Sequence, residues 1–306
     1  MSSLAPTTAL RLQGSVSAES AADLVHGVPG HGVPAHGSSG QGSSARVLAA
    51  FPDAAYLLFD HSHDAVVALL RRQALQLPNG VRLMGADTPD LRTVLDVGDQ
   101  VRVAADELGV RLLRVGALRI SLIGSHQPTR VRVQPDHHLD ADDLDALGAA
   151  PSLRSRAARL AAGLEADDPA QLADLIGWGR GLTPTGDDLT CGVLLALVAT
   201  EHLEPAHALD LLGGHGLRTT SLSARLLGCA ARGLAVPQVV DLVDTLLAPG
   251  RRVTTAQVRA VHAIGHSSGR DLCAGLAGAL DHVLGADPAP PTNPHVTPHF
   301  TEGKTA

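Results

Sequence analysis

The residues best suited to chemistry in this sequence lie in the stretch from Gly179 to Asp188, which reads GRGLTPTGDD. Glycines and hydroxyl side chains ahead of a helix present unpaired backbone N–H groups, and this arrangement favours an anion. Two adjacent aspartates, Asp187 and Asp188, instead favour an amide N–H, an ammonium or a hard cation. The stretch is not a P-loop, because Asp187 stands where that motif has lysine. It therefore predicts a site of mixed sign.

A second stretch, from Gly265 to Leu280, repeats the pattern of the first without gaps. Both contain a hydroxyl residue, glycine, any residue, aspartate, leucine, two further residues and glycine. Because residues four apart share one face of a helix, Asp188 lies on the face of Gly192, and Asp271 lies on that of Gly275. A glycine there lets a neighbouring helix approach closely. We predict that the two helices cross near these glycines and bring both aspartates into one pocket.

The predicted site has three catalytic candidates, which are His266, Asp188 and Asp271. His266 is the nearby residue suited to proton transfer near neutral pH. Arg180 and the hydroxyl groups favour an anionic oxygen, and a third stretch that starts at Arg218 contributes more weakly. The predicted substrate-binding residues are Gly181, Thr183, Thr185, Gly186, Asp187, Thr219, Ser267, Ser268, Gly269 and Arg270.

A purely structural interpretation of the first loop stays open beside the functional one. In it, Thr185 is the helix N-cap, Asp187 and Asp188 complement the helix dipole, and the glycines allow a tight reversal. His266 then bonds to the loop backbone.

The elements that must position these residues divide the chain into a β-rich part and a helical part, so the predicted fold class is α+β. We predict a flexible segment over residues 1–45 with a Gly/His/Pro-rich loop, a β-rich part over 46–136, a helical part with the site over 137–285, and a disordered tail over 286–306. Within the β-rich part, Val66 to Arg72 is predicted as a helix and Pro78 to Gly80 as a hairpin turn. Several predicted helices in the second part open with Asp, Ser, Thr or Pro and close on Gly.

Composition excludes several classes of function. Aromatic residues make up 2% of the chain, and 24 basic residues stand against 31 acidic ones. The chain therefore has too few aromatic side chains to stack on nucleic-acid bases. It also has no excess of basic residues to form a surface for DNA or anionic membranes. The first twenty residues lack a signal-peptide core, and three widely spaced cysteines fit reduced, buried side chains. We expect a cytoplasmic protein without cofactor or metal, and without nucleic-acid or membrane partners.

The sequence resembles a known family, the AllH-type subunit of bacterial oxamate carbamoyltransferase. Three segments carry the resemblance, namely GWGRGLTPTGDDLTCGVLLAL, TTSLSARLLGCAARG and GHSSGRDLCAGLAGAL, with support from ARVLAAFPDAAYLLFD and LPNGVRL. Together they cover most of residues 45–284.

The resemblance implies a role beside two larger carbamoyltransferase subunits in allantoin and purine nitrogen catabolism. There, oxalurate and phosphate give oxamate and carbamoyl phosphate. Such substrates carry anionic oxygens beside an amide NH2, which suits a site of mixed sign, and positioning and polarisation can supply much of the rate. Two alternatives stay open: a non-catalytic subunit for anion binding or assembly, and a metal-dependent amidohydrolase that uses Asp187, Asp188, Asp271 and His266.

Overall fold

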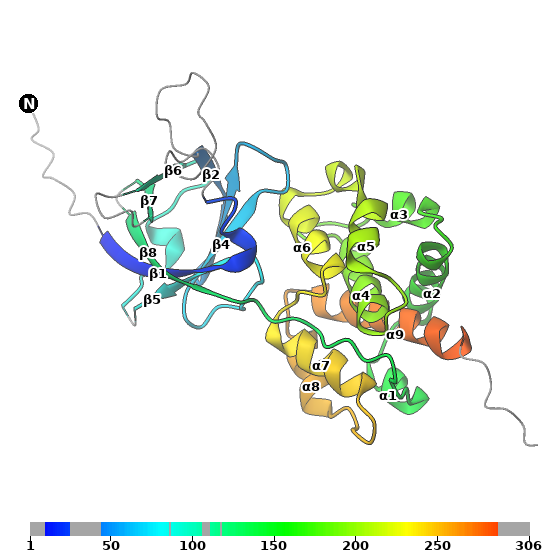
Figure 1. The fold of residues 1–306 in the computed structure, drawn as a ribbon. Coiled ribbons are helices and arrows are strands. Elements are labelled where there is room, and N and C mark those ends of the chain that lie inside the picture. Colours follow the sequence, from blue (N-terminus) through cyan, green and yellow to red (C-terminus); the bar gives the residue numbers. More distant parts are fainter. Residues whose placement is uncertain (1–9, 25–43, 86, 106–110, 117, 287–306) are drawn as a thin grey trace, which may run out of the picture.

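A computed structural model describes residues 10–24, 44–85, 87–105, 111–116 and 118–286, with a closed barrel in the N-terminal part and helices in the C-terminal part (Figure 1). This arrangement is compatible with the predicted α+β class. Residues 287–306 of the predicted tail, most of the Gly/His/Pro-rich loop and most of the rest of the predicted flexible segment lie outside the described residues.

Eight strands close the barrel among the described residues, in the order β1-β5-β4-β3-β2-β6-β7-β8. Parallel pairs join β1 to β8 and β4 to β5, and the other pairs are antiparallel. The strands are β1 Leu10–Ser17, β2 Ser44–Ala50, β3 Ala54–Phe59, β4 Val66–Leu70, β5 Gly80–Met84, β6 Gln100–Ala105, β7 Arg111–Val115 and β8 Leu118–His126.

Alternation along β3 explains how the barrel is filled and also how it meets the helices. Ala55, Leu57 and Phe59 belong to the barrel core. Tyr56 and Leu58 point to the opposite face, because successive side chains of a strand alternate. There they join a small apolar cluster that includes Leu222 of the helical part.

Three predictions about the N-terminal part are wrong. Leu10–Ser17, inside the segment predicted to be flexible, forms β1 and pairs with both β5 and β8. The predicted helix from Val66 to Arg72 is strand β4, whose five residues are all buried. A short run that is apolar throughout has no readable period, and here pairing on both edges makes it a strand.

The predicted hairpin at Pro78–Gly80 is also wrong, because β5 pairs in parallel with β4 and antiparallel with β1. The turn itself is present. Asn79 is buried and its side-chain amide donates to the Val66 carbonyl at 3.0 Å. Distant strands therefore decide the pairing, whereas the turn residues decide only the local bend.

Nine helices form the C-terminal part of the described chain, and they lie in the stretch predicted to be helical. Their starts follow the expected chemistry, since Pro151 and Pro205 stand in first turns and Thr254 forms a capping box with Gln257. The helices are α1 Ala141–Ala146, α2 Pro151–Glu165, α3 Ala170–Leu175, α4 Thr185–Ala199, α5 Pro205–Leu212, α6 Ser221–Ala231, α7 Pro237–Leu247, α8 Thr255–His262 and α9 Ser268–Ala286.

Helix α4 is the centre of the helical core. Residues 186–199 are all buried, and the helix packs against α9, α6 and α2. A helix that is buried on every face, as α4 is, is stabilised by the elements that surround it. No helix among the described residues has the length and apolar character needed to cross a membrane.

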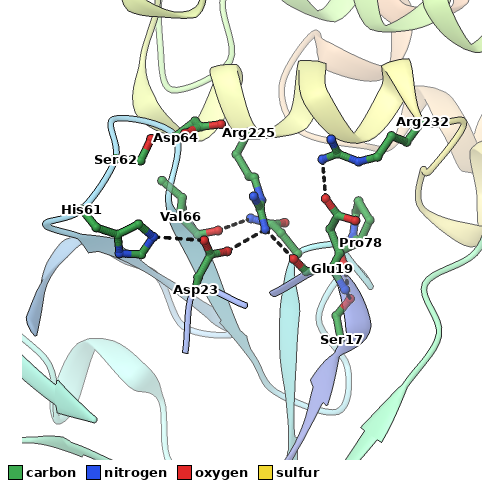
Figure 2. A network of polar contacts seen from close by, with 11 residues as sticks. Ser17, Glu19, Asp23, His61, Ser62, Asp64, Val66, Pro78, Arg225 and Arg232 are labelled. Carbon is green, nitrogen blue, oxygen red and sulfur yellow. Dashed lines mark hydrogen bonds and ion pairs between the residues drawn. The ribbon is translucent and has the colours of Figure 1, made fainter. Parts of the chain in front are cut away.

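A buried polar network joins the barrel to α6 (Figure 2). Arg225 donates to the Glu19 carbonyl and to the Asp23 carboxylate, both at 2.7 Å. His61 lies 3.3 Å from Asp23, and Arg232 pairs with the Glu19 carboxylate. The segment that follows β1 is thereby held against the helical part.

Candidate functional site

Helices α4 and α9 cross where the sequence predicts, at Gly192 and Gly275. A Cβ atom added to Gly192 would lie 2.2 Å from the Leu272 carbonyl oxygen, and one added to Gly275 would lie 2.1 Å from that of Leu189. Only glycine permits backbones to approach this closely. The predicted crossing is therefore confirmed.

The two loops that precede these helices also meet. Thr183 Oγ1 and Ser268 Oγ lie 2.9 Å apart and share a hydrogen bond. Gly186 and Gly269, predicted to bind substrate, are buried positions of close packing. A Cβ atom on them would lie 2.0 Å from the Leu175 carbonyl oxygen and 1.8 Å from that of Val261.

Asp187 ties the glycine loop together. Its buried carboxylate accepts the Gly177 N–H at 2.7 Å and the hydroxyl of Thr219. Gly177 adopts a positive φ of 80°, which favours glycine, and its Cβ position would lie 2.4 Å from the Arg218 carbonyl oxygen. Asp187 and Thr219, both predicted to bind substrate, thus bind each other and fix the loop.

Asp188 has a different environment, although it follows Asp187 directly. It is 7% exposed, and burial raises its pKa to about 7. Hydrogen bonding by the Ser268 and Thr183 hydroxyls lowers the pKa, whereas the charge of Asp271 raises it. A carboxyl with this pKa can take up or release a proton near neutral pH.

Asp188 and Asp271 also share an unusual feature, a buried carboxylate oxygen without a hydrogen-bond partner among the described residues. Within the described part of the chain, neither Asp188 Oδ2 nor Asp271 Oδ2 has a hydrogen-bond partner, and Asp271 is also only 7% exposed. Buried polar atoms are normally satisfied, so each of these oxygens calls for a donor, and the N–H groups of a ligand would supply one. The electrostatic effect of Asp271 on Asp188 agrees with the prediction that the two aspartates lie together.

A pocket of about 220 Å³ opens beside Asp188, between the barrel and the helices. Its polar residues at the loop end are Thr183, Asp188 and Ser268. The remaining wall is almost wholly apolar, and burial raises the pKa of the Cys191 thiol well above its usual range, so this side chain is neutral. The pocket is lined by Tyr56, Leu75, Leu77, Pro78, Thr183, Asp188, Cys191, Leu195, Leu222, Leu226, Ala230, Leu234, Ala235, Val236, Val239, Ile264, Gly265, Ser268 and Leu272.

Several predicted site residues lie away from this pocket. His266, Ser267 and Arg270 are exposed at the start of α9 and do not line it, and the same holds for Arg180 and Gly181 in the first loop. Thr185 is the first residue of α4 rather than its N-cap, which is Pro184. The cap prediction is wrong because Pro184 is the last residue with an extended ψ, 149°, and Thr185 already belongs to the helix.

The apolar wall was not predicted from the sequence. Its members come from α4, α6, α7, α9 and the barrel, and only the three-dimensional packing brings them together. One signal was available: alternation along β3 places Tyr56 outside the barrel core. Burial raises the pKa of Tyr56 above its ordinary value, so its phenol stays protonated.

The ligand set of the metal alternative is not assembled. Among the described residues, no three His, Cys, Asp or Glu side chains gather as a metal site requires. Asp187 already binds Gly177 and Thr219, and His266 is exposed. These residues therefore do not fit a divalent-ion site.

Neither curated proteins nor solved structures yielded a similar protein. Residues 175–280, which contain both loops, the crossing of α4 and α9 and most of the pocket wall, match the family described as oxamate carbamoyltransferase subunit AllH, and the resemblance seen in the sequence is thereby confirmed.

Proposed function

We propose that this chain is a subunit of an oxamate carbamoyltransferase-like enzyme in allantoin and purine nitrogen catabolism. The reaction converts oxalurate and phosphate to oxamate and carbamoyl phosphate. A phosphate oxygen bonds to the carbamoyl carbon, the bond from that carbon to the oxamate nitrogen breaks, and the proton of hydrogen phosphate ends on that nitrogen. The chain works in the cytoplasm with two larger partner subunits.

The observation that carries this proposal is the buried carboxyl group of Asp188. Its buried Oδ2 lacks a partner, and so does Asp271 Oδ2. The carbamoyl group of the substrate has an NH2 with two hydrogens to donate, and a buried acceptor left unpaired is costly unless a ligand satisfies it. We assign Asp188 and Asp271 to hold the amide nitrogen. With a pKa of about 7, Asp188 is also suited to transferring a proton during the exchange.

The anionic end of the substrate is assigned to the outer side of the loops. His266, Ser267 and Arg270 are exposed at the start of α9, and Arg180 is exposed in the first loop. The lining of the pocket includes no Lys, Arg or His among the described residues. Partner subunits therefore complete the phosphate side, and His266 acts there as the proposed acid or base.

The lining of the pocket favours a second candidate function. A pocket without a cationic side chain in the described chain also suits a subunit that binds a ligand or supports assembly without performing chemistry. In that case substrate raises the melting temperature of the chain but is not turned over.

The test is phosphate-dependent cleavage of oxalurate by the chain alone, by its partner subunits and by the mixture, with oxamate and carbamoyl phosphate as readouts. We expect activity only in the mixture, and a loss of at least tenfold for Asp188→Asn. The exposed Asp210→Asn is the matched control and keeps full activity. Partners that are fully active without this chain, or a mixture unaffected by Asp188→Asn, would contradict the proposal.

A further inference from the structure

The pocket beside Asp188 is much more apolar than a carbamoyl substrate requires. Oxalurate and phosphate are polar along their whole length, and burying a charged oxygen against apolar walls is costly. Those substrates use the loop end, where Thr183, Asp188 and Ser268 lie. Most of the 220 Å³ then has no assigned occupant.

The apolar chamber is elongated. On α4 it is lined by Asp188, Cys191 and Leu195, which follow at helical spacing on one face. Seven residues of helix correspond to about 10 Å along the axis. Leu222 and Leu226 of α6, also one turn apart, line it as well, so the chamber extends from the carboxyl of Asp188 between two helices.

The barrel closes this chamber from another side. Tyr56 of β3 and the segment before β5, with Leu77 and Pro78, belong to its wall. Ser17 donates to the Pro78 carbonyl at 2.5 Å, next to the network that holds Glu19 and Asp23 against α6 (Figure 2). Pro78 in the wall is therefore held by a hydrogen bond beside the ion pair that joins the barrel to α6, as is expected in a preformed ligand site.

We propose that this chamber binds a small primary amide with an aliphatic or aromatic body, the amide paired with Asp188 and the body enclosed between α4, α6 and the barrel. An amide and a carboxyl group complement each other with two hydrogen bonds. The amide N–H is donated to one carboxyl oxygen, and the carboxyl O–H is donated to the amide oxygen. No net charge is then buried, and the unpartnered Asp188 Oδ2 is satisfied.

This inference goes beyond carbamoyl transfer and does not depend on it. The chamber is a binding site for a class of ligand larger and more apolar than oxalurate. Under the proposed carbamoyl transfer, such a ligand competes with the carbamoyl group for Asp188, because both use the same carboxyl.

The test is a titration of the full chain with acetamide, butanamide and hexanamide, followed by ligand-observed NMR and by the melting temperature. Each methylene that enters the chamber should tighten binding by about fourfold. Hexanoate and hexylamine are the matched head-group controls, and both should bind at least tenfold more weakly than hexanamide. Asp188→Ala should weaken hexanamide by at least tenfold.

A variant that fills the chamber separates the contribution of the ligand's apolar body to binding from that of its amide group. Ala230 lines the chamber on α6, so Ala230→Leu should abolish the gain from acetamide to hexanamide and leave acetamide binding unchanged. Ala256→Leu, on the exposed side of α8, is the matched control. The chain-length series on the unmodified protein stands on its own if Ala230→Leu does not fold.

Equal affinity for acetamide and hexanamide would overturn the proposal, and so would tighter binding of hexylamine, which would assign the site to an ammonium group. Oxalurate cleavage without a chain-length effect would remove the chamber but keep the carbamoyltransferase. A chain-length effect without oxalurate cleavage would keep the chamber as a binding site and remove the carbamoyltransferase proposal.

Discussion

Gly192 of α4 and Gly275 of α9 face each other so closely that a Cβ atom on either would lie 3.0 Å from the Cα of the other. Each glycine lies one turn after an aspartate of the candidate site, Asp188 or Asp271. The approach of the two backbones therefore determines how near the two carboxyl groups come. Packing of the helices and geometry of the site depend on the same two residues.

Gly192→Ala is expected to push α4 and α9 apart, because the new methyl meets the Leu272 carbonyl oxygen at 2.2 Å. Overpacking of this kind costs about 1–3 kcal/mol or more in the free energy of unfolding, which urea denaturation measures. Gly285→Ala, in the partner helix α9, is the control, since its Cβ meets nothing within 4 Å. It should be neutral or stabilise by up to about 1 kcal/mol. A Gly192→Ala variant as stable as Gly285→Ala would refute the tight crossing.

Asp188 should make the stability of the protein fall as the pH rises from about 4 to about 8. Burial raises its pKa to about 7, so the folded state holds a proton that the unfolded chain has already released at pH 5 to 6. Ionising the buried carboxyl, which faces Asp271 and Asp187, therefore costs stability at the upper end of this range.

Asp188→Asn removes that cost. The variant should become more stable relative to the unmodified protein as the pH rises. The difference in their free energies of unfolding should grow by up to about 4 kcal/mol from pH 4 to pH 8. Urea denaturation at several pH values measures the difference, and the exposed Asp210→Asn is the control that should show no comparable trend. A constant difference across the pH range would mean that Asp188 titrates normally in the folded protein.

Much of the helical part could be predicted because its signals are local. Helix starts at Thr220 and Thr254 carry their capping chemistry in the adjacent residues. The closure of the barrel could not be predicted, because β1 pairs with β8 across more than 100 residues, for example Leu10 with Leu118. No local pattern specifies which distant strand completes a sheet.

The candidate site was predictable to the same extent. The repeated glycine and aspartate spacing located the crossing of α4 and α9, because helix periodicity is a local property. It could not separate Asp187, which binds Gly177, from Asp188, which keeps an unpartnered oxygen. Nor could it place His266, since the direction of a loop side chain depends on the turn that carries it. Tertiary packing decides all three.

Asp187 and Thr219 should be energetically coupled. Their hydrogen bond joins the start of α4 to the segment before α6, and Asp187 is buried. Asp187→Ala and Thr219→Val should each destabilise the protein, and the double variant should cost less than their sum by about 1–3 kcal/mol. A double-mutant cycle in urea measures this coupling, with Asp187→Ala and the distant Thr93→Val as the control pair. Additive effects for Asp187 and Thr219 would show that the bond contributes no coupling energy.

The network in Figure 2 should make Arg225 one of the most costly residues to remove. Arg225 is 8% exposed and donates to both the Glu19 carbonyl and the Asp23 carboxylate, so Arg225→Met leaves Asp23 with less compensation in a buried place. The expected loss is about 3–5 kcal/mol in the free energy of unfolding. Arg252→Met is the control, because the side chain of Arg252 is 58% exposed where it pairs with Asp140, Asp142 and Asp143, and its loss should cost clearly less than that of Arg225.

Loosening this network should also open the pocket, since Tyr56 and Pro78 of the barrel form part of its wall. We expect Arg225→Met to speed alkylation of Cys191, which lines the pocket, more than that of Cys273, which is buried in the helical core. Mass spectrometry of the labelled peptides under native conditions gives both rates. Equal acceleration at the two thiols would point to global unfolding, and no acceleration together with unchanged stability would mean that the barrel is held to α6 mainly by the apolar contacts around Leu58 and Leu222.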